Sequence, residues 1–211
     1  MTVRSIASGS ISVMNMKKIL FLLVSTGILI SFISPQLQEV HPAIFGKEEE
    51  SFGIQRFREK REAPPFSLKT LQGNQITLAD LKGKPTLLTF WASYCGSCKE
   101  EMPVIEKFSA GKRDDLNIFT MVIDGENVKR VQRFVKGSKI TLPVILDIKE
   151  RVARSYGVRM VPTTFLIDRD GIILGMIVGE RDWSLPEVWP TLKEVFNLPS
   201  LTRSAAPDSA R

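Results

Sequence analysis

Two cysteines, Cys95 and Cys98, are the only thiols in this chain of 211 residues, and two residues separate them. Thiolates at this spacing interconvert between a dithiol and a disulfide. An apolar, strand-like segment precedes them at residues 85–91, and a helix-like segment follows at residues 99–108. The free N–H groups and the dipole of a helix N-terminus stabilise a thiolate. We therefore expect Cys95 to attack a disulfide and Cys98, one turn further on, to resolve the mixed disulfide.

A cysteine pair at this spacing has two other possible uses, a zinc site and a purely structural disulfide. A closed zinc site takes about four ligands, but the chain has no further cysteine and its single histidine, His41, lies far upstream. A purely structural disulfide that closes so small a loop removes little chain entropy. The sequence therefore favours an exposed redox site, and we expect neither a metal nor a cofactor.

The segment WASYCGSC at residues 91–98 resembles the active site of the thioredoxin superfamily, and CKEEMP at residues 98–103 resembles its TlpA/ResA-like branch. The resemblance covers residues 63–198. It implies an α/β thioredoxin fold in which helices flank a central mixed sheet. It also implies an N-terminal β-hairpin before the core and a helix-strand insertion at residues 128–147.

The resemblance assigns a proton-handling role to Glu101. Thioredoxins carry a buried acid six residues before the first cysteine, and here that position is Thr89. The branch has a glutamate at the position of Glu101, one helical turn after Cys98. In a partly apolar site its carboxyl would exchange protons near neutrality. The alternative is a solvated surface glutamate.

The resemblance also implies roles for residues around the cysteines. Pro162 matches the superfamily's cis-proline, and the backbone of Val161 would receive an extended client segment. Trp91 is expected to bind the substrate together with Val161 and Pro162, and to pack under the active-site loop. Gly96 and Ser97 are expected to tune the reduction potential. Serine adds no charge beside Cys95, unlike the histidine of strongly oxidising relatives.

The remaining pattern predicts alternating strands and helices, which favours a partly parallel sheet. Continuous apolar runs are typical of buried strands. Strands are predicted within residues 66–69, 75–77, 85–91, 116–123, 142–147 and 172–178, and helices within 78–84, 99–108, 127–136, 149–156 and 184–196. The segment at residues 157–168 is expected to lead through a hairpin turn at residues 169–171 into the last of these strands.

The residues before the domain indicate export. Lys17 and Lys18 directly precede an apolar run at residues 19–33, which is the pattern of a secretory signal. We expect a leader at residues 1–18 in the cytoplasm and a signal-anchor at residues 19–34, with the catalytic domain on the extracytoplasmic, periplasmic side. A cleaved signal and a secreted form are the alternative. Residues 35–62 are interpreted as a charged linker and 199–211 as a disordered tail.

The formal charge of +6 comes from bases interspersed with acids, a distribution that does not indicate nucleic-acid binding. The family resemblance implies a membrane-tethered oxidoreductase that reduces disulfides of exported proteins such as apocytochrome c. A membrane thiol-reductant transporter would supply its electrons.

Three alternatives for this function stay open. One is a disulfide-forming oxidase, and another is a non-catalytic thioredoxin-fold binding module. The third is a peroxiredoxin-like peroxidase, which needs Thr or Ser three residues before the reactive cysteine and proline seven before it. Here those positions are Ala92 and Leu88.

Overall fold

A six-stranded mixed sheet forms the centre of the computed structural model, which describes residues 51–199. Its strand order is β1-β8-β7-β4-β5-β6, with β4, β5 and β6 parallel and the other pairs antiparallel. The strands are β1 (Ile54–Glu62), β4 (Thr86–Trp91), β5 (Asn117–Val122), β6 (Val144–Leu146), β7 (Thr163–Ile167) and β8 (Ile172–Val178).

The strand β4 lies between β5 and β7, and all of its residues are buried. A strand covered on both faces has no solvent side, so its sequence is a continuous run with little polar alternation. By contrast, burial alternates residue by residue along β8, which lies next to the edge strand. The carboxyl end of β4 leads directly into the two cysteines.

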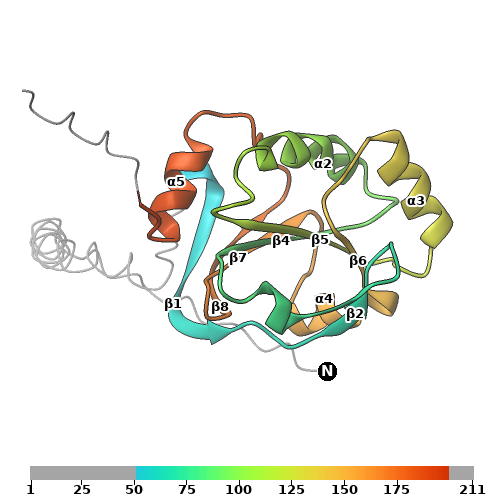
Figure 1. Ribbon diagram of the computed structural model, residues 1–211, viewed down its shortest axis with the longest axis horizontal. Helices are drawn as coiled ribbons and strands as arrows, with labels where there is room; N and C mark the ends of the chain where they lie inside the picture. Colours follow the sequence, from blue (N-terminus) through green and yellow to red (C-terminus); the bar gives the residue numbers. More distant parts are fainter. Residues whose placement is uncertain (1–50, 200–211) are drawn as a thin grey trace, which may run out of the picture. The chain divides into compact units, whose positions relative to one another are not determined.

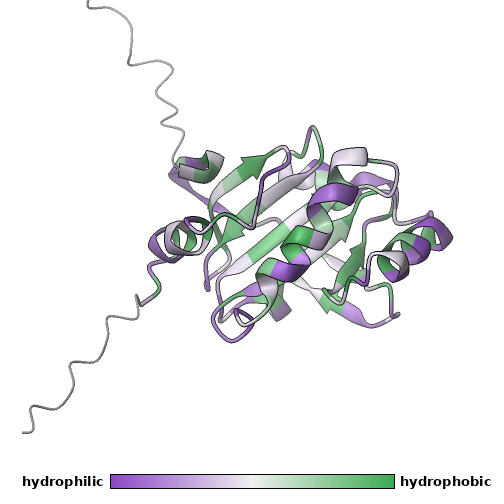
Figure 2. Ribbon diagram, turned by 90° about the horizontal axis from the view of Figure 1, so that it is seen from above, coloured by the Kyte–Doolittle hydropathy of each residue, from purple (hydrophilic) through white to green (hydrophobic). Residues whose placement is uncertain are grey.

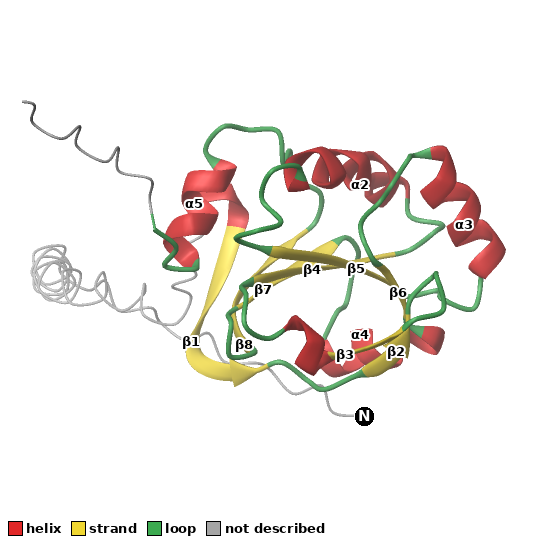
Figure 3. Ribbon diagram, viewed as in Figure 1, coloured by secondary structure: helices red, strands yellow, loops and turns green. Residues whose placement is uncertain are grey.

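Helices cover both faces of the sheet (Figures 1 and 3). The helices α2 (Gly96–Ser109), α3 (Val128–Gly137) and α5 (Val188–Val195) contribute to one apolar cluster. The other face carries α4 (Arg151–Tyr156) with the 3-10 helix η2 (Leu78–Leu81) and the hairpin of β2 (Ser67–Lys69) and β3 (Gln75–Thr77). Two short 3-10 turns, η1 (Ser51–Gly53) and η3 (Ile148–Glu150), complete the described elements.

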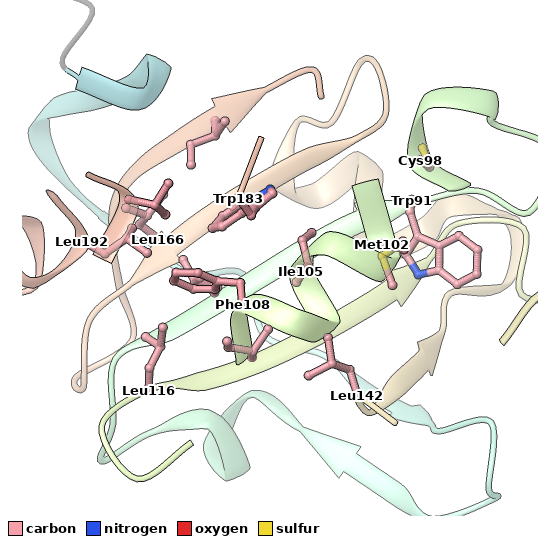
Figure 4. Packing of buried hydrophobic residues seen from close by; sticks show 14 of the residues in the cluster. Trp91, Cys98, Met102, Ile105, Phe108, Leu116, Leu142, Leu166, Trp183 and Leu192 are labelled. Atoms are coloured by element: carbon pink, nitrogen blue, oxygen red, sulfur yellow. The ribbon is translucent and has the colours of Figure 1, made fainter. Parts of the chain in front are cut away.

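Two separate apolar clusters form the core, one on each face of the sheet. Figure 2 shows the hydrophobic colour concentrated in the strands, while the helices carry both hydrophobic and hydrophilic residues. In the first cluster Phe108 of α2 packs against Trp183, whereas Met102 lies beside Trp91 and Ile105 lies between the two tryptophans (Figure 4). The helix that begins at the redox pair is therefore held by a fully buried face.

One sequence prediction about the chain's organisation was wrong. Residues 51–62 belong to the domain and not to the predicted charged linker at residues 35–62. Ile54 is fully buried, and β1 pairs with β8 as an edge strand of the main sheet. Burial along β1 is confined to a few positions, because an edge strand with one solvated face keeps mostly polar side chains.

The secondary structure otherwise follows the predicted alternation, with ends shifted by a few residues. Helix α2 begins at Gly96, before the predicted start, and α5 begins at Val188, after it. Within residues 51–199 no helix has the length and hydropathy needed to cross a bilayer. The predicted leader, the signal-anchor at residues 19–34 and most of the predicted tail lie outside the described residues.

Candidate functional site

Cys95 and Cys98 form a disulfide at the N-terminus of α2. Cys95 is the N-cap residue, and the backbone N–H of Cys98 donates to its sulfur at 3.1 Å. Cys98 is completely buried, whereas Cys95 is half-buried. Because an incoming disulfide can reach only the more exposed sulfur, the geometry assigns the first attack to Cys95 and resolution to Cys98.

The two residues between the cysteines face different surroundings. Gly96 is exposed, and Ser97 is half-buried with its Oγ 3.5 Å from the Cys95 sulfur. A hydroxyl at this distance offers a weak, uncharged interaction to a thiolate. Neither residue brings a full charge to the site.

The loop before β7 lies against Cys95 from the other side of the site. The Val161–Pro162 peptide bond is cis, as the family resemblance implied, and the carbonyl oxygen of Val161 lies 3.7 Å from the Cys95 sulfur. Two large apolar side chains next to these residues are exposed, Tyr94 at 58% and Met160 at 56%. The exposure of these two side chains was not predicted from the sequence.

Trp91 does not meet its expected substrate-binding role. Its side chain is completely buried and packs against Phe134 of α3, with ring centroids 5.2 Å apart. A side chain with no exposed surface makes no contact with a docked client. Trp91 instead belongs to the same buried apolar cluster as Cys98.

Asp124 anchors the turn that carries Cys95. This role was not predicted from the sequence, where the available signal was an acidic residue directly after a buried strand. Its carboxylate accepts hydrogen bonds from the backbone N–H of Ser93, at 2.8 Å, and from the Ser93 hydroxyl. The side chain of Asn127 donates to the same carboxylate. Since β4 and β5 are parallel neighbours, their carboxyl ends meet at one edge of the sheet and bring Asp124 beside Ser93.

Glu101 is buried in the side of α2, with 2% of its surface exposed. Its Oε1 accepts hydrogen bonds from Nε1 of Trp183, at 2.7 Å, and from the backbone N–H of Arg181, at 3.1 Å. Burial raises the pKa of Glu101 to about 7, although these two hydrogen bonds act in the opposite direction. The alternative of a solvated surface glutamate is therefore wrong.

Thr89, where thioredoxins carry their buried acid, makes a different contact. Its hydroxyl lies 2.9 Å from that of Thr164 on β7, and both residues are buried. The pair satisfies two hydroxyl groups across neighbouring strands and holds no ionisable group. Glu101, three residues after Cys98, is instead the buried acid of α2.

The positions that the peroxidase alternative requires hold apolar side chains. Ala92 and Leu88 are both completely buried. Neither can donate a hydrogen bond to a peroxide bound at Cys95. The arrangement of the site does not support this alternative.

Comparisons with known proteins agree with this geometry. The model of the AhpC/TSA family matches residues 60–176. The thiol-disulfide oxidoreductase ResA of Bacillus subtilis is 35% identical over 81% of this chain and 92% of its own length. The thioredoxin-like protein YneN of the same organism is 40% identical over 60% of this chain and 74% of its own length.

Solved structures show the same fold. A putative thiol:disulfide interchange protein DsbE from Chlorobium tepidum matches with a TM-score of 0.60 and 28% identity, over 66% of this chain and 99% of that one. StoA from Bacillus subtilis matches with a TM-score of 0.53 and 30% identity, over 63% of this chain and 96% of that one. Both matches place the described domain among thioredoxin-fold proteins.

Proposed function

This chain belongs to the AhpC/TSA family and to its ResA-like thiol-disulfide oxidoreductases, and we propose that it reduces disulfides of exported proteins while tethered to the membrane. The observation that carries the proposal is the disulfide at the start of α2, in which only Cys95 is open to solvent. This arrangement suits a dithiol that exchanges with large, disulfide-containing partners.

The reaction begins from the reduced pair. The Cys95 thiolate attacks one sulfur of the client disulfide, which forms a mixed disulfide and releases the other client sulfur as a thiolate. Cys98 then loses its proton, and its thiolate bonds to the Cys95 sulfur while the bond from Cys95 to the client breaks. Two electrons pass from the dithiol to the client, and the Cys95–Cys98 disulfide remains.

The client would dock beside the reactive sulfur. Tyr94 and Met160 provide exposed apolar contacts there, and the backbone of Val161 would pair with an extended segment of the client. A short chain segment with a disulfide in a CxxCH motif, as in an apocytochrome c before haem attachment, fits these needs. The recharging partner would be a membrane protein that carries reducing equivalents outward.

The direction of exchange is tested by the reduction potential of the Cys95–Cys98 pair. We expect a value below about −200 mV, in the range of reducing family members, since no cationic side chain stabilises the Cys95 thiolate within the active-site turn. Equilibration of the purified chain with defined thiol–disulfide buffers measures it, with the Cys95→Ser variant as the control without a redox couple. A potential near about −120 mV would make the protein a disulfide-forming oxidase.

The location rests on the sequence before the described domain. Lys17 and Lys18, followed by the apolar run at residues 19–33, support an N-terminus in the cytoplasm and an exported domain. A reporter that is active only after export, fused beyond residue 33, should therefore be active. Activity only from a cytoplasmic reporter would contradict export, and release of a soluble domain that lacks residues 19–33 would contradict the anchor.

A further inference from the structure

The carboxyl group of Glu101 is held by one oxygen only. Trp183 lies 82 positions further along the chain, and its Nε1–H donates to Oε1 at 2.7 Å. The backbone N–H of Arg181 donates to the same oxygen. The second oxygen, Oε2, is buried and has no hydrogen-bond partner among the residues that the structure describes.

We propose that Trp183 is a positioning residue for proton transfer at the redox pair, fixing Oε1 as an acceptor and leaving Oε2 to take up and return the proton. A carboxyl oxygen that accepts two N–H donors cannot itself carry the proton without losing one of them. The proposal rests on the proposed function of the Cys95–Cys98 pair.

The proton balance of the resolving step follows from this arrangement. While the client is bound to Cys95, the Cys98 thiol gives up its proton, and Oε2 of Glu101, one helical turn further along α2, takes up a proton in the same step. The Cys98 sulfur then bonds to the Cys95 sulfur, and the client sulfur leaves with the electron pair of the broken bond and takes a proton from water. When a donor reduces the pair again, Oε2 gives up its proton and the Cys98 sulfur takes one up.

The indole itself is held from two sides. Phe52 of η1 packs against it edge-on, with ring centroids 5.1 Å apart, and Phe108 of α2 packs at 5.4 Å. Figure 4 shows Trp183 beside Phe108 within the first apolar cluster. With 1% of its surface exposed, the ring has little freedom to turn its Nε1 away from Glu101.

Two charged residues of the same loop also act on the carboxyl. Glu180 raises the pKa of Glu101 and Arg181 lowers it, and both effects are smaller than those of burial and of the two hydrogen bonds. The largest interaction that favours the ionised form is the hydrogen bond from Trp183. Removing that donor should therefore change the titration more than removing either charge.

The Trp183→Phe variant tests the proposal because it keeps an aromatic ring and deletes the N–H donor. In the oxidised full-length protein, the carboxyl carbon of Glu101 is followed by carbon-13 NMR as the pH changes. We expect the midpoint to rise by roughly one pH unit from its wild-type value near 7. The pH profile of mixed-disulfide resolution should move upward with it.

Trp189→Phe is the matched control. Trp189 also packs against Phe108, with ring centroids 6.3 Å apart, but the hydrogen bonds to Glu101 come from Trp183 and Arg181. Its replacement should leave the Glu101 midpoint unchanged. An unshifted or lowered midpoint in Trp183→Phe, or an equal shift in both variants, would overturn the positioning role.

If the Trp183→Phe variant does not fold, the proposal can still be tested in the protein that keeps Trp183. The Nε1–H signal of Trp183 should titrate with the Glu101 midpoint and lose this titration in Glu101→Gln. The indole N–H of Trp91, which has no partner among the described residues, serves as the reference. A Trp183 signal that is flat across neutral pH would overturn the proposal. Neither titration requires a client, so both can fail while the reductase function stands.

Discussion

Glu101 shows how burial converts an ordinary side chain into a group that titrates near neutrality. The residue lies on the inner face of α2, and its carboxyl leaves water for a site where, among residues 51–199, its hydrogen-bond partners are two N–H donors. These donors stabilise the charged form, but desolvation outweighs them and raises the pKa to about 7.

The raised pKa predicts how stability depends on pH. Between the usual glutamate pKa of 4.5 and about 7, the native state holds a proton that the unfolded chain has lost. The free energy of unfolding therefore falls as pH rises through this window, by up to about 3 kcal/mol. Glu101→Gln keeps an acceptor for Trp183 and removes the titration, so its stability should be flatter over the same window. Urea unfolding of the oxidised proteins from pH 4.5 to 8 measures this, and parallel curves would contradict it.

The strand β1 is attached to the domain through a single buried face. Ile54 is fully buried opposite Ile177 of β8, while most of the charged side chains of β1 face solvent. The same segment brings Phe52 against Trp183. The N-terminal extension is thereby joined both to the sheet and to the residue that holds Glu101.

Truncation of Ile54 tests whether β1 belongs to the folded domain. Ile54→Ala removes buried methyl groups and leaves a cavity, so we expect a loss of about 2–5 kcal/mol in the free energy of unfolding. The control is Leu185→Ala, which alters a side chain with 41% exposure and should change stability by less than about 0.5 kcal/mol. Denaturant unfolding measures both variants. If Ile54→Ala lowered the free energy of unfolding as little as Leu185→Ala does, residues 51–62 would be a linker and not part of the folded domain.

At the scale of the whole molecule, bases and acids are interspersed along most of the chain, but one stretch carries bases alone. The formal charge is +6, and no acidic residue occurs from Asn127 to Leu146. Within this stretch α3 exposes Lys129, Arg130, Arg133 and Lys136, while Phe134 packs on Trp91 just before the redox turn. In Figure 2, α3 lies at the right and is largely hydrophilic. The fold thus places a basic helix beside the redox helix.

This distribution predicts that acidic clients react faster at low salt. Attraction between exposed charges is screened over about 10 Å at 0.1 M ionic strength, so the rate constant for reducing an acidic model peptide should fall several-fold as salt rises. A neutral peptide with the same disulfide is the control. The Arg130→Glu/Arg133→Glu double variant should reduce the salt dependence, and an unchanged dependence in that variant would assign the effect to the rest of the molecule.

The sequence by itself determined the local features of this protein. The spacing of Cys95 and Cys98, the apolar run before them and the helical pattern after them place the disulfide at a strand–helix junction, because each of these signals lies within a few residues. The continuous apolar strands and the alternation with helices likewise predicted the parallel part of the sheet, whereas its mixed character came from the family resemblance. The burial of Glu101 followed only from family resemblance, since its own neighbours in sequence include the exposed Glu100.

The tertiary structure decided which distant groups meet. Trp183 reaches Glu101 across 82 positions, and Asp124 reaches Ser93 across 31. Hydrophobic periodicity and secondary-structure propensity each describe one helix or strand at a time. They therefore do not predict which loop packs over which helix. For the same reason a charged edge strand resembled a solvated linker, and Trp91 was assigned to the client surface. Only the packing of α3 over the sheet shows that Trp91 is enclosed, and only the pairing of β1 with β8 shows that the domain begins before residue 63.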